Sequence, residues 1–165
     1  MATVQERLST AQWVLERQLA WIAQAELKAG AVLTVQLALL GGVSGLYAAA
    51  TPTTGGGVVL CALVALLALV SAFCAGMVVK PRVSGPVVSL LFFGKVVEID
   101  EGEYAKRFRN VSNDDLLLDW SVQIHRNAAI ANDKHRWVAR AVQFGLAAGF
   151  ALAPLAAVLL ATKGK

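Results

Sequence analysis

The stretch AGAVLTVQLALLGGVSGLYAAA, residues 29–50, decides the fold because its 22 consecutive residues include no charged side chain. About 20 apolar residues cross the roughly 30 Å hydrocarbon core of a bilayer as an α-helix, so this stretch predicts a membrane span. Residues 58–79 predict a second span, and residues 141–162 predict a third that tolerates the internal Pro154. The fold class that follows is an all-α membrane protein.

The composition of the whole chain supports a membrane protein over a soluble one. Of its 165 residues, 57% are hydrophobic and 16% are charged, against about 45–50% and about 25% in typical soluble domains. The mean hydropathy is +0.60. In such a chain the formal net charge of +4 describes membrane orientation first, so we expect no nucleic acid as a partner.

The charged residues divide the chain into four predicted parts. Residues 1–28 form an amphipathic helix, residues 29–79 a transmembrane hairpin with a turn at residues 51–57, and residues 141–162 the third span. Residues 80–140 carry ten of the fifteen basic and eight of the eleven acidic residues. The positive-inside rule places residues 80–140 and the N-terminus in the cytoplasm, and the uncharged turn outside.

The segment between the second and third spans combines an irregular part with a long helix. Residues 87–97 are β-branched and apolar but interrupted by a glycine, which favours either a short strand or a buried loop. Residues 112–115, Ser-Asn-Asp-Asp, have the spacing of a capping box, and neither proline nor glycine follows until Gly145. One stalk helix is therefore predicted to run from Asn113 into the third span.

A helical wheel sorts the soluble part of this stalk into two sides. The polar side holds Asp119, Gln123, Arg126, Asn127 and Lys134. The apolar side holds Leu117, Trp120, Ile124, Ala128, Ala131 and Val138, and this side must pack on another element.

The chain carries no recognisable motif for catalysis, a cofactor or a metal. It lacks a Walker loop, an H-E-x-x-H pair and a nucleophile elbow, so we expect that it is not an enzyme. His125 and His135 are ten residues apart, which is not the spacing of a helical metal pair. Cys61 and Cys74 lie about 20 Å apart along one helix, so they cannot form a disulfide within it.

Four other features carry chemistry that the sequence leaves open. The basic run Lys106-Arg107-Phe108-Arg109, with Arg82 and Lys95, suits either a ligand phosphate or lipid headgroups. Nearby aromatic residues either stack a base or form a small core. Glu26 lies beside the first span, where a carboxylate needs water, a functional role or an ion pair with a basic residue. The Gly-x-x-x-Gly pairs at residues 41–45 and 145–149 allow close helix packing, as in a homo-oligomer.

The order of these parts resembles the Pycsar transmembrane effectors, bacterial antiphage proteins that act beside a pyrimidine nucleotide cyclase. The resemblance covers most of the chain. It rests first on an acidic residue that stands two positions before a Lys-Ala pair at the start of the first span. The second element is an aromatic-glycine sequence, and the third is a set of acidic, glutamine and lysine positions before the last span. These are Glu26 with Lys28, Phe92-Phe93-Gly94, Asp119, Gln123, and Lys134-His135. The family more often has Asp where Glu26 stands, and an aromatic residue where His135 stands.

The resemblance implies a sensor in the cytoplasm that binds cyclic UMP or cyclic CMP. It further implies spans that impair the bacterial inner membrane, so that abortive infection ends growth before phage mature. The candidate ligand-binding residues are Arg82, Lys95, Lys106, Arg107, Arg109, Phe93 and Gly94. The candidate coupling residues are Glu26, Lys28, Asp119, Gln123 and Lys134.

Two other classes of function compete with this one. A small, non-signalling membrane scaffold would use the same basic segment to hold anionic lipid or a protein partner. An integral membrane enzyme would need polar groups clustered in the spans, and Thr34, Gln36, Ser44 and Gln143 show no such pattern in the sequence.

Overall fold

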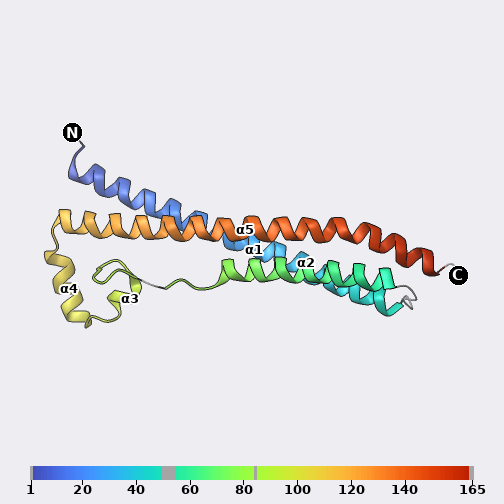
Figure 1. The fold of residues 1–165 in the computed structure, drawn as a ribbon. Coiled ribbons are helices and arrows are strands. Elements are labelled where there is room, and N and C mark those ends of the chain that lie inside the picture. Colours follow the sequence, from blue (N-terminus) through green and yellow to red (C-terminus); the bar gives the residue numbers. More distant parts are fainter. Residues whose placement is uncertain (1, 50–54, 84, 164–165) are drawn as a thin grey trace. The chain divides into compact units, whose positions relative to one another are not determined.

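The computed structural model describes residues 2–49, 55–83 and 85–163 (Figure 1). These residues form five α-helices and no strand, which confirms the predicted all-α class. The helices are α1 (Val4–Ala49), α2 (Gly55–Val79), α3 (Phe93–Val96), α4 (Glu101–Asn110) and α5 (Asn113–Lys163). Three of them, α1, α2 and α5, are long and apolar enough to cross a membrane, in agreement with the three predicted spans.

Capping side chains fix where the two longest helices begin. Thr3 Oγ1 accepts the Glu6 N–H at 3.2 Å, and the Glu6 carboxylate accepts the Thr3 N–H at 2.7 Å, which is a complete capping box. At α5, Ser112 Oγ accepts the Asp115 N–H at 3.1 Å, as predicted, but the Asp115 carboxylate accepts the Ser112 hydroxyl at 2.6 Å. Aspartate is one methylene shorter than glutamate, which is consistent with it bonding to the hydroxyl here.

The predicted turn at residues 51–57 is wrong at its C-terminal end. Residues 51–54 lie outside the described residues, but α2 already begins at Gly55, so Gly55–Gly57 form its first turn. The N–H groups of a first helical turn have no intrahelical partner in any sequence, and glycine is tolerated there. Gly57 is also buried, so its small size serves packing.

By its contacts the chain divides into two compact units. The polar unit comprises residues 1–24 and 81–133, and the membrane unit comprises residues 25–80 and 134–165. Helices α1 and α5 each contribute residues to both units.

The membrane unit has two clusters of buried apolar side chains, contributed by α1, α2 and α5. The first contains Ala25, Ala29, Cys74, Ala75, Val78, Val138 and Ala141, and the second Val43, Cys61, Val64, Leu155 and Leu159. Alanine dominates the first cluster, which lets the three helix backbones approach closely. The two cysteines are free thiols in different clusters, as their spacing predicted.

In the polar unit, residues 87–92 form an irregular loop, so the strand alternative is wrong. Val87 and Val88 are 89% and 80% exposed, although their side chains favour strands. A strand needs a partner strand for its backbone hydrogen bonds, and the described residues provide none. The loop alternative, predicted for residues 87–97, holds only in part, because residues 93–96 form the helix α3 and because Ser89 is the only buried residue of residues 87–92.

Candidate functional site

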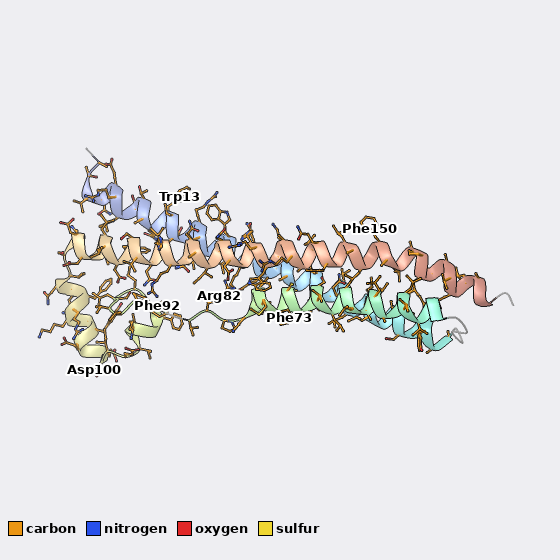
Figure 2. All side chains as sticks on the ribbon, in the orientation of Figure 1. Trp13, Phe73, Arg82, Phe92, Asp100 and Phe150 are labelled. Carbon is orange, nitrogen blue, oxygen red and sulfur yellow. The ribbon has the colours of Figure 1, made fainter. Side chains whose placement is uncertain are left out.

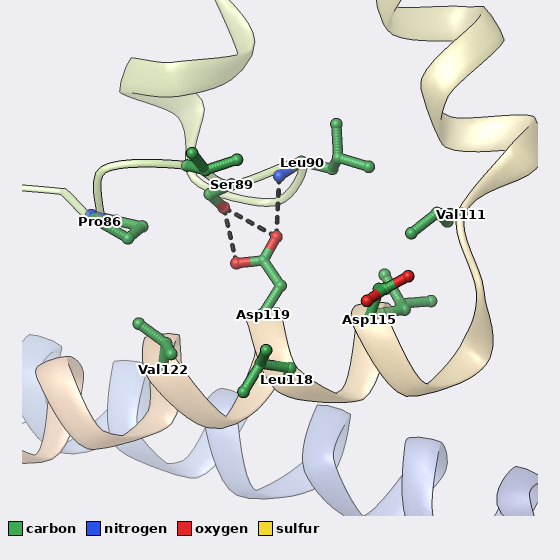
Figure 3. Close-up of a pocket in the computed structure, with 10 residues that line it drawn as sticks. Pro86, Ser89, Leu90, Val111, Asp115, Leu118, Asp119 and Val122 are labelled. Carbon is green, nitrogen blue, oxygen red and sulfur yellow. Dashed lines mark hydrogen bonds between the residues drawn. The ribbon is translucent and has the colours of Figure 1, made fainter.

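The loop at residues 87–92 is held on α5 by a polar cluster centred on Asp119 and Ser89 (Figure 3). The Asp119 carboxylate accepts the Ser89 hydroxyl at 2.8 and 2.9 Å and the Leu90 N–H at 2.8 Å. Ser89 Oγ in turn accepts the N–H groups of Leu91 and Phe92 at 3.0 and 2.8 Å. The loop therefore satisfies three successive backbone N–H groups without regular secondary structure.

Gln123 completes this cluster from the same side of α5. Residues four apart lie one above the other on a helix, so Asp119 and Gln123 both meet the loop. Gln123 is buried, and its amide donates to Ser89 Oγ at 3.2 Å. These two positions were expected from the family motif. Ser89 was missed, although a single serine in an apolar run just before Phe-Phe-Gly is the signal that marks it.

The Phe92 side chain packs directly over two glycines. A Cβ atom on Gly85 would lie 2.0 Å from Phe92 Cε1, and a Cβ on Gly94 would lie 2.7 Å from the same atom. Any side chain at either position collides with the ring. Gly94 therefore allows Phe92 to close over the loop, while Phe93 is largely exposed.

A first cavity of about 440 Å³ lies beside Asp119 and Ser89, and Figure 3 shows its lining. Its walls are mainly apolar, and its two charged side chains, Asp115 and Asp119, are both acidic. We call it the Asp119 cavity. Two carboxylates without a basic residue disfavour a phosphate-bearing ligand here.

A second cavity of about 370 Å³, the Arg82 cavity, combines basic, aromatic and amide side chains. Arg82 and Phe92, labelled in Figure 2, both line it. The full lining is Leu15, Leu19, Arg82, Leu91, Phe92, Phe93, Trp120, Gln123, Arg126, Asn127 and Ile130, all in the polar unit. Arg82 is oriented by the Asp133 carboxylate, 2.7 Å from Nη2, and by the Ile130 carbonyl, 3.3 Å from Nη1.

A third cavity of about 420 Å³ contains two of the predicted basic residues, Lys95 and Arg107. Each is already paired, Lys95 with Glu98 at 2.8 Å and Arg107 with Glu103 at 2.8 Å. Asp100 adds a third carboxylate to the lining, so acidic groups outnumber basic ones. We call it the Lys95 cavity.

The predicted ligand-binding residues are thus distributed over several places. Arg82 and Phe93 line the Arg82 cavity, and Lys95 and Arg107 line the Lys95 cavity. Lys106 and Arg109 line none of the three cavities and are exposed on α4. Gly94 lines none of them either, and its place is beneath the Phe92 ring.

In the membrane unit, Glu26 and Lys134 form an ion pair that involves all three long helices. Lys134 Nζ lies 2.7 Å from Glu26 Oε1 and also donates to the Val78 carbonyl in the last turn of α2. Carbonyls in a last turn have no intrahelical partner, so Lys134 acts as a cap for α2. The ion pair that the sequence left open as one alternative for Glu26 is present. Lys28 is exposed and does not join this contact.

Replacing Asp119 with alanine is expected to release the loop at residues 87–92. The change leaves the Ser89 hydroxyl and the Leu90 N–H without their acceptor, which costs the closed loop about 2 kcal/mol of stability. That energy corresponds to roughly 30-fold faster hydrogen exchange at the amides of the loop. Exchange measured by mass spectrometry checks this, with Asp114→Ala as the matched control because Asp114 is an exposed carboxylate on the same helix. Unchanged exchange at Leu90 in Asp119→Ala would contradict this anchoring.

Comparison with known proteins agrees with these features. The chain matches the family model of the Pycsar effector protein domain over residues 10–162. No curated protein and no solved structure matches it. The matched range includes most of both units, the cluster at Asp119 and the ion pair at Glu26. With three membrane-length helices and a match over nearly its whole length, the chain belongs to the Pycsar effector family.

Proposed function

We propose that this Pycsar effector binds cyclic UMP or cyclic CMP in its polar unit and then impairs the bacterial inner membrane through its membrane unit. The proposed outcome is abortive infection, with a pyrimidine nucleotide cyclase as the functional partner. The effector acts without catalysis or a cofactor. The family assignment supports the general role, and the Arg82 cavity is the observation that carries nucleotide binding.

The Arg82 cavity has the chemistry that a cyclic pyrimidine nucleotide requires. The ligand offers one negative phosphodiester, a flat base and hydrogen-bonding groups at the base edge. Arg82 keeps donors beyond those used by Asp133 and Ile130, since a guanidinium has five N–H groups. Phe92, Phe93 and Trp120 offer faces for stacking, and Gln123 and Asn127 offer amide groups.

The other two cavities are less suitable because of their charge. The Asp119 cavity is lined by two carboxylates, and the Lys95 cavity by three carboxylates and two already paired cations. A phosphodiester entering either one would be repelled or would have to displace an ion pair. The Arg82 cavity is therefore the favoured site.

Replacing Arg82 with alanine is expected to weaken nucleotide binding by about tenfold or more. A charge-assisted contact to a phosphate contributes roughly 1.5–3 kcal/mol, and the variant removes it. Isothermal titration of cyclic UMP and cyclic CMP into detergent-purified protein measures the affinity. Arg109→Ala is the comparison on exposed α4, where we expect less than a twofold effect.

A second variant separates binding from folding. Asp133→Asn breaks the ion pair with Arg82 but keeps the guanidinium, so it should retain nucleotide affinity. Equal losses of nucleotide affinity in Arg109→Ala and Arg82→Ala would indicate that the binding site lies at α4. The absence of binding by every cyclic nucleotide, in protein shown to be folded, would favour the scaffold alternative.

We further propose that the N-terminus and residues 80–140 lie in the cytoplasm, and that the connection between α1 and α2 lies outside. The charge asymmetry of the sequence supports this orientation. In a variant that lacks Cys61 and Cys74, a single cysteine at Thr53, which lies outside the described residues, should react from outside, and one at the exposed Ser112 should react from inside. Labelling with an impermeant thiol reagent in intact and opened cells checks this. The opposite pattern would exclude a cytoplasmic sensor.

A homo-oligomer is part of the proposal, and the glycines of α1 support it. Among the described residues, a Cβ on Gly41, Gly42 or Gly45 would meet no atom within 4 Å apart from its chain neighbours and the backbone of its own helix, so these glycines do not serve packing between the described helices of one copy. Gly145 differs, because a Cβ there would approach Gln36 and Ser71 of the same chain. The α1 pair is therefore the one left for contact between copies.

A further inference from the structure

The membrane unit is basic at the end where α1, α2 and α5 meet the charged parts of the chain. Its single acidic residue, Glu26, is already paired with Lys134. The exposed cations that flank the uncharged stretches at this end are Lys28, Lys80, Arg136 and Arg140. None of these four takes part in an ion pair within the described residues. This end of the unit therefore carries positive charge that the described chain does not neutralise.

Two of these cations, Arg136 and Arg140, lie one turn apart on α5. Side chains four residues apart on a helix are neighbours, and like charges at this spacing repel each other. Asp133, the nearest carboxylate along α5, is already paired with Arg82. Each guanidinium has five N–H donors, so two of them can bind one phosphate group and remove their repulsion.

The depth of this pair in the membrane follows from its place in α5. Arg140 is the last charged residue before the uncharged stretch at residues 141–162. Long side chains on a helix point towards its N-terminus, and Arg140 Cζ lies 4.7 Å from the ring centroid of Trp137, three residues earlier. The guanidinium therefore extends out of the hydrocarbon core to the level of the lipid headgroups, where tryptophan is also favoured.

The surroundings of the pair favour a lipid over a small soluble anion. Phe144 is exposed one turn beyond Arg140, within the uncharged stretch. Phe73 of α2 is 64% exposed and packs edge-on against Trp137, with ring centroids 6.5 Å apart. Acyl chains attached to a bound phosphate therefore meet apolar and aromatic surface.

The charge of this end also favours one class of lipid. A zwitterionic headgroup brings an ammonium group together with its phosphate, and the membrane unit has no unpaired carboxylate to accept that group. An anionic headgroup brings only the charge that the arginines attract. Complementary charge selects between partners of otherwise similar shape, so an anionic lipid fits better.

We propose that Arg136, Trp137 and Arg140 form a binding site for the phosphate of an anionic phospholipid, in the leaflet at this end of the membrane unit. The two guanidinium groups bind the phosphate, and Trp137 orients the Arg140 side chain. The bound lipid neutralises the two arginines and holds α5 at a fixed depth. The proposal depends on α5 spanning the bilayer, and not on nucleotide binding.

Native mass spectrometry tests the site, because it counts the molecules of each lipid bound to one protein. The protein is measured in detergent with equimolar phosphatidylglycerol and phosphatidylcholine of the same acyl chains. The parent should retain phosphatidylglycerol preferentially. Arg136→Gln combined with Arg140→Gln should lower this preference by roughly fivefold for each arginine removed. Glutamine has nearly the helix propensity of arginine, so α5 should stay intact, and circular dichroism checks its helix content.

A matched control removes the same charge from another place. Lys106→Gln combined with Arg109→Gln changes two exposed cations of α4 and should leave the lipid preference unchanged. Loss of preference in the α5 variant alone supports the proposal. Equal retention of both lipids by the parent would overturn it, as would a preference that the α5 variant keeps. An equal loss in the α4 variant would also overturn it, because overall charge would then explain the selection.

Discussion

Replacing Glu26 with alanine is expected to destabilise the membrane unit more than replacing its partner Lys134 with methionine. Lys134 is only 3% exposed, whereas the Glu26 side chain is 45% exposed. Without Glu26, the buried ammonium keeps only the Val78 carbonyl, and breaking a buried pair in this way costs about 3 kcal/mol or more. Without Lys134, the carboxylate remains hydrated and the cost is about 1–2 kcal/mol.

The double variant gives the sharper result. Glu26→Ala combined with Lys134→Met removes the stranded ammonium, so it should be more stable than Glu26→Ala alone. Reversible unfolding in mixed micelles measures the three free energies. Glu16→Ala is the control on α1, since the Glu16 contact is an exposed hydrogen bond with Gln12 and its loss should cost less than about 0.5 kcal/mol. Equal costs for the two single variants would contradict the asymmetric burial of this pair.

The membrane helices were predictable because the bilayer sets a length that the sequence must meet. Uncharged stretches of 22 residues have few alternatives to a spanning helix. The continuity of α5 was also predictable, since residues 112–115 cap its start and no helix breaker follows for about 30 residues. The helical state of Gly55–Gly57 was not predictable, because glycine serves a turn and a first helical turn equally well.

The loop at residues 87–92 shows where local preference fails. Its valines favour a strand, but three backbone N–H groups bond instead to the side chains of Ser89 and Asp119. Asp119 is 30 residues away in the sequence, so no local pattern reveals the contact. The structure of the loop is decided by a distant carboxylate.

The helical wheel of the stalk does not reveal burial, for a related reason. It sorts residues by polarity alone, and so it places Gln123 and Lys134 on the polar side. Both are among the most buried residues of α5, because Ser89 and Glu26 supply their hydrogen bonds. Buried polar residues with partners look the same in a sequence as solvated ones.

The basic run at residues 106–109 shows why the sequence alone could not locate the candidate site. Neighbours in sequence are turned by about 100° on a helix, so Arg107 points towards the Lys95 cavity while Lys106 and Arg109 do not line it. A dense run of charge in the sequence is therefore divided once it forms a helix. The Arg82 cavity was not recognisable in the sequence, since its lining comes from α1, the connection that holds Arg82, the loop at residues 87–92, α3 and α5.

Inserting Gly-Gly between Asp133 and Lys134 is expected to abolish membrane damage while preserving nucleotide affinity. α5 is continuous across this junction, where its residues pass from the polar unit to the membrane unit. The ion pair of Arg82 with Asp133 lies before the insertion, and that of Glu26 with Lys134 lies after it. Each unit keeps its own contacts, but two residues turn the helix after the insertion by about 200° relative to the part before it.

The size of the effect separates helix register from simple weakening. Two glycines cost about 2 kcal/mol of helix propensity, whereas a ligand that converts a 1:99 equilibrium to 99:1 supplies about 5.5 kcal/mol. Weakening alone would therefore leave a response, so complete loss points to the changed register. Ala-Ala at the same position turns the helix equally without the propensity cost and should also abolish damage.

The measurements are nucleotide affinity in detergent and membrane potential, by a fluorescent dye, in cells that also express the cyclase. If both insertions depolarise cells like the parent at equal expression, α5 does not transmit the signal, and the connection at residues 80–86 becomes the better candidate.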